Sequence, residues 1–470
     1  MSRFRVVALI GLLAGCTGSP VRQHGIETGG RVGSGAEGDR ESANDGAVRN
    51  VGHEEVSGAS TVGLSLEMAI TTAVGNNPRL RAVRLEAGVA EAQIYAASIY
   101  PFNPQFNSTV RDARFSNGGG HAEGQLYSLS QELELAGQRD HRRAEADASH
   151  QRVLWEIEAA EIGVAIQVRR AFFTAVYRRQ KWELAESIAK VNQELSEVLD
   201  RRYKAQLATL ADVSISKVEA RDAARRARAA RADYDAAMVE LRRALGGTGK
   251  VAVVPTDELP SAAVYSEIEN VPDRMVEQAL AERTDLKARK SEVETASARL
   301  RLARAGRIPN VTVGVEYERD ESATKFIGGM VSVPIPIINN NRGVVSQREA
   351  ELVRASGQVT QLQTEIRQET EAALQRYERA REQGLANERD ARDGLEVEQK
   401  HIEDLYREGE ADLLRVYEVR QRLNQVQDAY LDALFELQQA ETDLAAALGQ
   451  PFRTLKSVDM KPTGPKQPNP

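Results

Sequence analysis

The chain has 470 residues and a net charge of −7, which argues against a surface built mainly to bind nucleic acid or another polyanion. Charged residues make up 28% of the chain and aromatic residues only 5%. This composition favours long solvated helices that pack along narrow apolar seams, rather than a thick globular core. The sequence contains no apolar run of about eighteen residues or more, so no helix is expected to span a bilayer.

The N-terminus has the pattern of a secretory signal. Two arginines and an apolar run over residues 6–13 precede Cys16, the single cysteine of the chain. Residues 1–15 resemble a bacterial lipoprotein signal peptide, and the resemblance implies that Cys16 is lipidated and becomes the mature N-terminus. By the same resemblance, Thr17 in place of an Asp after that cysteine implies sorting to the outer membrane, where two or more acyl chains anchor a protein stably. The alternative is a soluble chain whose apolar N-terminus is incidental.

Residues 16–63 are rich in Gly, Ser, Glu and Asp, which indicates a flexible, solvated linker. The segment Gly33-Ser34-Gly35-Ala36-Glu37-Gly38 matches the glycine pattern of dinucleotide-binding proteins. No strand pattern precedes it and no helix pattern begins on it, so the match carries no weight and no cofactor is expected.

The first ordered half is predicted over residues 64–247. Two helices end near residues 76 and 98, two strands follow at about 104–115 and 125–135, and a long helical hairpin covers 139–245. Gly246-Gly247 is a typical helix stop. At 1.5 Å per residue, the first arm of the hairpin is on the order of 95 Å long.

After a proline-containing linker or equatorial region at 248–270, the second half repeats this order over residues 271–451. One helix is expected from about 273 to 305, strands at about 310–318 and 326–337, and a helical hairpin over 342–448. Both strands alternate apolar and polar residues, as in Val311, Val313, Val315 and Tyr317 on one parity. Residues 452–470 are predicted to form a flexible tail.

The last helix has a regular apolar seam. Its apolar residues step by three and four, which is typical of coiled-coil packing: Leu423, Val426, Tyr430, Ala433, Leu437, Ala440, Leu444 and Ala447.

Constant offsets show that the two halves are a duplicated unit. Downstream of the strands, Arg139 and Arg342 are 203 residues apart, as are Gly246 and Gly449. Upstream of them, Leu80 and Leu286 are 206 apart. Each half is therefore helix, strand hairpin, long helix and long helix, with a small insertion in the strand region.

Four amphipathic strands are too few to close a membrane barrel, since known barrels begin near eight strands. An open sheet edge in lipid leaves backbone groups unpaired. The chain is therefore expected to oligomerise and to share one barrel, with its long helices packed side by side into a tube.

Over about residues 64–451 the chain resembles the TolC-like outer-membrane efflux proteins. The features that carry the resemblance are the lipoprotein signal and four motifs: Asn77-Pro78-Arg79-Leu80, Ser130-Gln131-Glu132-Leu133 with Gly137-Gln138-Arg139, Val333-Pro334-Ile335-Pro336-Ile337, and Asn341-Arg342-Gly343. They look most like the heavy-metal (cation) efflux branch.

The resemblance implies a mainly α fold with a membrane β-barrel part, formed by a homotrimer. Three copies of four strands and four long helices make a 12-stranded outer-membrane barrel continued by a 12-helix periplasmic tunnel. Such proteins are exit ducts of tripartite pumps. The implied partners are a periplasmic adaptor (membrane fusion) protein, an inner-membrane transporter of the RND type and outer-membrane lipid, with no nucleic acid.

The resemblance also places the working end at the tips of the two helical hairpins. The implied adaptor contacts are Leu207, Thr209, Leu210 and Asp212 in the first tip and Gly409, Glu410, Asp412 and Leu413 in the second. Arg415 and Glu418 match positions that ring the constriction in the family. Arg415 departs from the acidic pattern, whereas three copies of Glu418 near one axis would attract cations and raise one another's pKa. The competing interpretation of these acids is a solvated helix end.

Other functions are alternatives to heavy-metal efflux. The same fold serves multidrug or small-molecule efflux and type I secretion. A non-channel periplasmic coiled-coil lipoprotein explains Cys16 and the helices, but it leaves the amphipathic strands unexplained. Catalysis is not expected: the six histidines form no metal-ligand pattern, and Ser214-Ile215-Ser216-Lys217 matches a Ser-x-x-Lys nucleophile only at a spacing common by chance in helices.

Overall fold

The computed structural model describes residues 62–114, 121–247, 253–267, 272–393, 401 and 413–450. The chain divides into two units, Met1–Ser57 and Gly58–Pro470, and every described residue belongs to the second. Cys16, the linker predicted over residues 16–63 apart from its last two residues, and the tail at 452–470 lie outside the described residues.

The first half begins with the short strand β1 (Val62–Leu64) and two helices, α1 (Leu66–Asn76) and α2 (Pro78–Ser98). Asn77 separates the helices, because its extended backbone ends α1 and its side chain caps α2, accepting hydrogen bonds from the backbone N–H groups of the second and third residues of α2 at 2.9 and 3.2 Å. Proline at the first helical position suits this helix start, since its missing N–H has no helical partner there.

Four antiparallel strands form one sheet in the order β2-β3-β5-β6. They are β2 (Gln105–Arg114), β3 (His121–Leu133), β5 (Val311–Arg319) and β6 (Lys325–Ser332). The pairing of β3 with β5 joins the two halves of the chain. The strand expected over 326–337 is shorter, because prolines 334 and 336 lack the N–H groups that a ladder requires.

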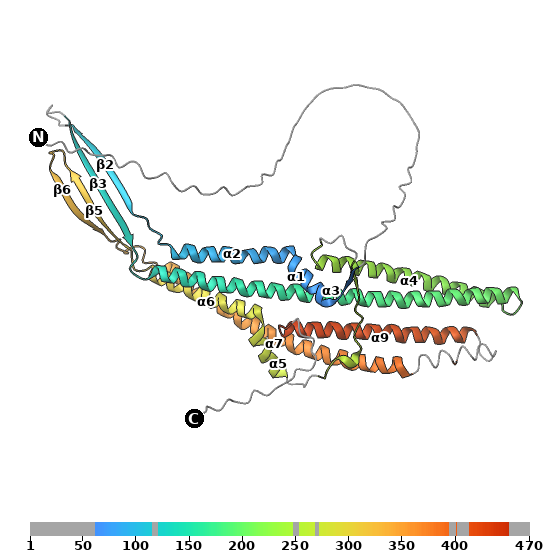
Figure 1. Ribbon diagram of the computed structural model, residues 1–470. Helices are drawn as coiled ribbons and strands as arrows, with labels where there is room; N and C mark the ends of the chain where they lie inside the picture. The colour runs from blue at the N-terminus through green and yellow to red at the C-terminus, as the bar shows by residue number, and fades with distance from the viewer. Residues whose placement is uncertain are drawn as a thin grey trace, which may run out of the picture. The chain divides into compact units, whose positions relative to one another are not determined.

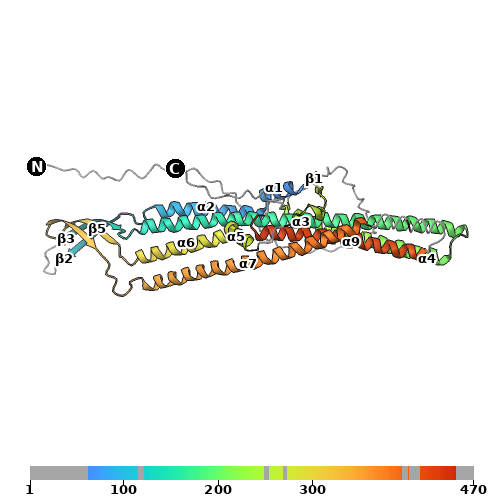
Figure 2. The same cartoon turned by 90° about the horizontal axis from the view of Figure 1, so that it is seen from below.

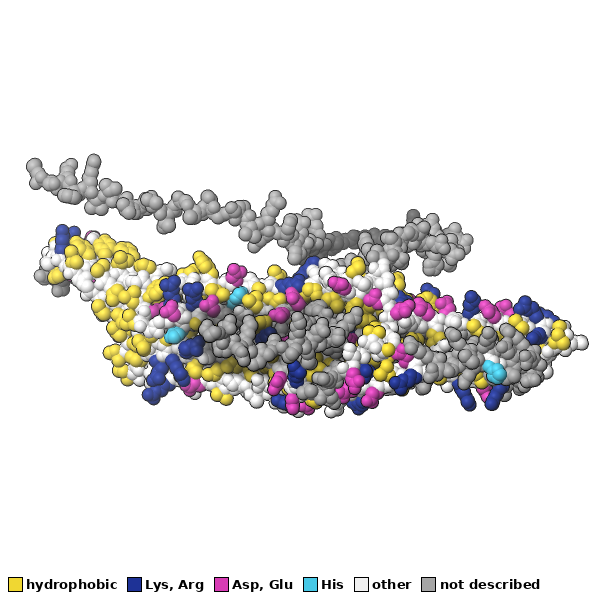
Figure 3. Space-filling model, turned by 60° about the horizontal axis from the view of Figure 1, so that its bottom comes forward, with side chains coloured by type: hydrophobic (Ala, Val, Ile, Leu, Met, Phe, Trp, Pro, Cys, Tyr) yellow, Lys and Arg dark blue, Asp and Glu magenta, His cyan; other side chains and the backbone are white. Residues whose placement is uncertain are grey.

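The strand register separates an apolar and a polar face. Phe106, Leu129 and Val315 lie opposite one another across three strands, and Tyr317 lies between Tyr127 and Ile327. Stacked ring contacts at 6.3 Å join Phe106 to Tyr127 and Tyr127 to Tyr317. The opposite face carries polar residues, among them Asn107, Thr109, Ser128, Ser130, Glu132, Thr312, Glu316 and Glu318. Figure 3 shows hydrophobic side chains gathered over the strands and charged side chains over the helices.

The described residues contain six further α-helices: α3 (Gln138–Lys204), α4 (Leu210–Ala244), α5 (Pro272–Glu282), α6 (Thr284–Ala305), α7 (Arg342–Asp393) and α9 (Leu413–Ala447). In chain order, α3 to α6 lie between β3 and β5, and α7 and α9 come after β6. Within the second unit, α3 packs against α2, α4, α6 and α9, and α7 packs against α6 and α9. Figures 1 and 2 both show the sheet at one end of these helices and α4 and α9 toward the other. Among the described residues, no helix combines the length and apolar character needed to cross a membrane.

The helix expected from 273 to 305 is broken at Arg283. The backbone there has φ −60° and ψ 122°, nearly the same as the −62° and 118° of Asn77, its counterpart at the 206-residue offset. The matching helix stops also agree, because Gly246 and Gly449 both have positive φ. Gly246 lies against Asn77 and its neighbour, and Gly449 lies against Arg283. The duplicated unit is thus repeated in backbone detail.

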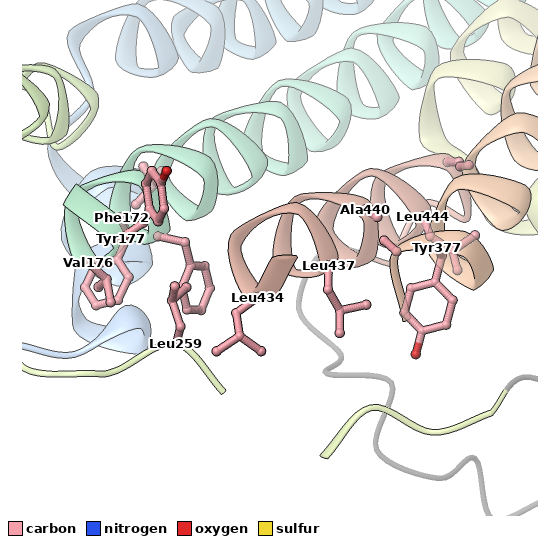
Figure 4. Packing of buried hydrophobic residues seen from close by; sticks show 14 of the residues in the cluster. Phe172, Val176, Tyr177, Leu259, Tyr377, Leu434, Leu437, Ala440 and Leu444 are labelled. Carbon is pink, nitrogen blue, oxygen red and sulfur yellow. The ribbon is translucent and has the colours of Figure 1, made fainter. Parts of the chain in front are cut away.

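The core lies where α3, α7 and α9 meet. Phe172 of α3, Tyr377 of α7, and Leu437 and Leu444 of α9 are almost fully buried. Figure 4 shows Tyr377 beside Leu444 at one end of this row of side chains and Phe172 at the other, with Leu437 between them. Six of the eight seam residues predicted in α9 are buried and two are half-buried, so the 3-4 spacing correctly predicted the inner face of this helix.

The connection between the halves packs against the helices. Its strand β4 (Val253–Pro255) pairs in parallel with β1, and a short 3-10 helix covers Ala262–Val264. Leu259 and Ala262 are buried in the core. Arg179 of α3 donates hydrogen bonds to the carbonyl oxygens of Pro255 and Asp257. Residues 253–267 are therefore a packed belt, which the composition of a linker did not reveal.

Candidate channel wall and helical tip

A capping box shapes the tip of the first hairpin. The backbone N–H of Asp212 donates to the Thr209 hydroxyl at 3.2 Å, and the Thr209 N–H donates to the Asp212 carboxylate at 2.9 Å. These reciprocal bonds satisfy two backbone donors at the start of α4. Thr209 and Asp212, both predicted as adaptor contacts, therefore set the direction in which α4 leaves the turn.

Two leucines project from the same tip. Leu207 is 76% exposed and Leu210 is 63% exposed. The structure thus brings four predicted contact residues together, two as a polar cap and two as an apolar surface. Removing large apolar side chains from water is favourable, so exposed leucines at a tight turn suit a partner that buries them.

The tip rests on a small buried cluster. Leu199 of α3 and Val213 of α4 are buried against each other, and Tyr417 of α9 packs against them. Asp200 accepts hydrogen bonds from Lys204 at 2.7 Å and Lys217 at 2.9 Å. These bonds, opposed by partial desolvation, lower the Asp200 pKa to about 2. The contact of Tyr417 ties the first hairpin to the second.

The second predicted tip is largely outside the described residues. Gly409, Glu410 and Asp412 are not described, and Leu413 is described only as the first residue of α9. Arg415 and Glu418 lie in the first turns of α9 and form an ion pair of 3.5 Å. Within one chain, the negative charge of Glu418 is thus balanced by Arg415, the residue that departs from the acidic pattern of the family.

A buried polar cluster between the halves was not predicted. Arg169 of α3 pairs with Glu441 of α9, and their side chains are 5% and 2% exposed. Gln438 donates to Glu441 at 2.9 Å and accepts from the hydroxyl of Tyr265, in the belt, at 2.5 Å. Burial and the nearby Glu441 charge raise the pKa of Tyr265. The cluster joins α3, α9 and the belt at one point.

More contacts between α3 and α9 lie closer to the tip. The Tyr177 hydroxyl donates to Asp432 at 2.6 Å, and burial followed by this hydrogen bond raises the Tyr177 pKa. Lys181 pairs with both Asp428 and Asp432. Spacing along one helix gives no sign of these pairs, because their members are about 250 residues apart.

The family motifs at the sheet end meet in space. Gln138, which is buried, donates to Asn310 at 3.0 Å, and Asn310 donates to Glu132 at 2.7 Å. The Asn341 amide donates to the carbonyl oxygen of Ala303 at 2.8 Å. The first two bonds connect the two halves where strands become helices, and the third joins the end of α6 to the residue before α7 within the second half.

The side chains of the Ser-x-x-Lys match form hydrogen bonds and an ion pair within the hairpin. The Ser214 hydroxyl donates to the Leu210 carbonyl at 2.8 Å, the buried Ser216 hydroxyl donates to Val213 at 2.9 Å, and Lys217 pairs with Asp200. Among the described residues, His, Asp and Glu side chains form no group of three that could hold a metal ion.

The chain matches the model of one protein family, described as outer membrane efflux protein, over residues 69–247 and 275–450. One relative is the cobalt-zinc-cadmium resistance protein CzcC of Cupriavidus metallidurans, 24% identical over 289 residues, covering 60% of this chain and 65% of the relative. Another is the pyoverdine export outer membrane protein OpmQ of Pseudomonas putida, 29% identical over 215 residues, covering 42% and 44%. The alignments therefore span less than two thirds of either relative.

Solved structures show the same fold. CusC, whose structures describe transmembrane channel formation, matches with a TM-score of 0.67 and 16% identity, covering 83% of this chain and 93% of CusC. The outer membrane protein VceC of Vibrio cholerae matches with a TM-score of 0.63 and 17% identity, covering 83% and 97%. At these identities the likeness concerns the fold alone.

Proposed function

Because the chain belongs to the outer membrane efflux protein family, we propose that it is the exit duct of a tripartite efflux pump and conducts substrate passively through the outer membrane. The observation that carries this proposal is the amphipathic four-stranded sheet. Its end strands β2 and β6 each have one partner strand among the described residues, and one of its faces is apolar.

A homotrimer would satisfy both features of the sheet. Pairing β6 of one copy with β2 of the next closes three sets of four strands into a 12-stranded barrel, which leaves no unpaired edge in lipid. The apolar face then meets lipid and the face with Glu316 and Glu318 lines the lumen. The helices continue as a 12-helix tunnel into the periplasm, and acylation of Cys16 adds a lipid anchor.

The tip of the first hairpin is the proposed docking site for a periplasmic adaptor. Leu207 and Leu210 supply apolar contact area, and the Thr209–Asp212 capping box fixes the turn that presents them. Gly409, Glu410, Asp412 and Leu413 are proposed to do the same in the second hairpin, with Arg415 and Glu418 at the constriction above. An inner-membrane transporter of the RND type completes the pump.

The proposed substrate is a divalent heavy-metal cation. The CzcC relative is a cobalt-zinc-cadmium resistance protein, and carboxylates on the polar face of the sheet suit the passage of cations. A second candidate is a small organic molecule, because the OpmQ relative exports pyoverdine.

Growth of a deletion strain on cobalt, zinc and cadmium, and on a panel of drugs, separates these substrates. Loss of metal resistance that the intact gene restores supports the cation. Sensitivity to drugs alone moves the proposal to small-molecule export, and an unchanged strain contradicts efflux as the function.

A pair of matched variants tests the tip. Leu210→Asp should abolish complementation while the detergent-extracted protein stays trimeric, because it places a charge in the proposed docking surface. Val218→Asp is the control, since Val218 is equally exposed at 63% but lies two turns farther along α4. If both variants complement normally, the tip is not the docking site. A monomer that is soluble without detergent contradicts the duct itself.

A further inference from the structure

A hollow of about 480 Å³ lies where the sheet meets the helices in the second half. Gly306, Arg307 and Pro309, which follow α6, form one side of it, and residues 334–340, which precede α7, form the other. The duct described above does not use this space.

The first half has a tyrosine at the corresponding corner. At the 206-residue offset, Gly306 corresponds to Tyr100, and the strands that follow begin at Gln105 and Val311, also 206 apart. The Tyr100 hydroxyl donates to the carbonyl oxygen of Glu132 at 2.9 Å and accepts from the backbone N–H of residue 134 at 2.8 Å. An aromatic ring thus bridges this corner in the first half, whereas Gly306 has no side chain and the Asn341 amide lies 3.0 Å from where its Cβ would be.

The wall of the hollow continues the apolar face of the sheet. Ile335 and Ile337 have the same parity as Ile327 and Val331 of β6, and they are 78% and 82% exposed. Ile338 is fully exposed. Since the apolar face is the one assigned to lipid, these isoleucines extend it past the end of the strand.

Hydrogen-bond donors collect at the rim of the hollow. Arg307 lines it and forms no ion pair with any described residue. Asn339 and Asn340 also line it, and their side-chain oxygens accept backbone N–H groups of the loop at 3.0 and 3.3 Å. Because their oxygens are used in this way, the side-chain N–H groups of these amides are the atoms that can donate to a ligand. A guanidinium and two amides next to exposed isoleucines suit a ligand with an anionic head and an apolar chain.

We propose that the hollow binds an anionic phospholipid of the surrounding membrane. An acyl chain lies along Ile335 and Ile337, and Arg307 contacts the phosphate with help from Asn339 and Asn340. The position agrees with this occupant, because the apolar face of the sheet ends here and a basic side chain at that level reaches the head groups. The inference rests on the proposed function, which places the sheet in a membrane.

Native mass spectrometry of the detergent-purified protein tests the site, with phosphatidylglycerol and phosphatidylcholine of identical acyl chains as probes. The wild type should bind phosphatidylglycerol more tightly. Arg307→Gln should weaken that binding about fivefold, which corresponds to about 1 kcal/mol for one basic residue at a membrane surface. Arg301→Gln, an exposed arginine on α6 outside the hollow, should leave it unchanged.

A second variant separates the contribution of the lipid acyl chain from that of the lipid head group. Ile337→Ser should weaken both lipids to the same extent, because it removes apolar wall and leaves Arg307 in place. Circular dichroism of each variant verifies that it is folded. Equal binding of both lipids by the wild type, which is the result if a neighbouring copy covers the hollow, overturns the inference, as does an Arg307→Gln variant that keeps the preference.

Conductance in planar bilayers, measured on the same samples, keeps the two proposals apart. A conducting protein without lipid preference retains the duct and loses the lipid site. A wild type that does not conduct contradicts the duct, whatever its lipid binding.

Discussion

The buried pair Arg169–Glu441 gives the sharpest test of how the two halves are joined. Its side chains are 5% and 2% exposed, so each charge depends on the other for solvation. Arg169→Met leaves the Glu441 carboxylate buried without its counter-ion, and removing one partner of a buried pair costs about 3–5 kcal/mol. Each of the variants Arg169→Met and Glu441→Leu should lose that much unfolding free energy.

The double variant should behave differently. With Arg169→Met and Glu441→Leu together, no buried charge remains, and apolar replacement of a buried pair is often neutral or stabilising. We expect an unfolding free energy within about 1 kcal/mol of the wild type, reduced only by the hydrogen bond that Gln438 then loses.

The neighbouring residue supplies a matched control. Arg170 pairs with Asp443 at 2.6 Å, but its side chain is 50% exposed. Because water screens such a pair, Arg170→Met should cost less than about 1 kcal/mol.

Guanidinium unfolding in one detergent, followed by circular dichroism, compares the variants through their midpoints at a common slope. A double variant as unstable as the single ones would refute the reasoning, since the loss would then come from packing. If the single variants lose no more unfolding free energy than Arg170→Met does, water reaches the Arg169–Glu441 pair and it is not buried in solution.

Other features give further predictions. Burial, and next the Glu441 charge, raises the Tyr377 pKa from 10.0 to about 12. This stabilisation is present below pH 10 and lost as pH rises to about 12, so Tyr377→Phe should remove part of the alkaline loss in a pH series of melting curves. Thr209→Ala should cost about 1 kcal/mol at the start of α4, detected as faster hydrogen exchange in its first turn. A Cβ at Gly314 lies 2.8 Å from the Leu129 carbonyl oxygen, whereas one at Gly329 has no atom closer than 4.0 Å. Gly314→Ala should therefore reduce assembly on native gels, and equal assembly of both alanine variants would contradict the register.

The elements that the sequence predicts best are those with a local signal. Alternating side chains predicted the strands, and the two prolines explain why β6 ends at Ser332. The helix break at Arg283 has no such signal. Its counterpart Asn77 has a capping side chain and is followed by a proline, whereas Arg283 has neither feature. Its guanidinium instead bonds to Asp285 and Glu369. One local partner, Asp285, and one distant partner, Glu369, thus hold Arg283 at this break.

The candidate site divides in the same way. Thr209 and Asp212 have the spacing of a capping box, so their neighbourhood could be expected from the chain alone. Arg169 lies in a helix rich in arginine, and nothing local distinguishes it from its solvated neighbours. Its partner is 272 residues away, and only the packing of α3 against α9 brings the two together.

The joining of β3 to β5 has a consequence for biogenesis. Gln125 pairs with Arg319, so the central ladder cannot start until most of the polypeptide has been synthesised. The helical hairpins depend on nearby partners and can form earlier, whereas ladder closure over so long a loop is slow. Meanwhile β2 and β3 can form only an isolated hairpin, which is marginally stable in water. During that interval the unpaired strands are most exposed to aggregation.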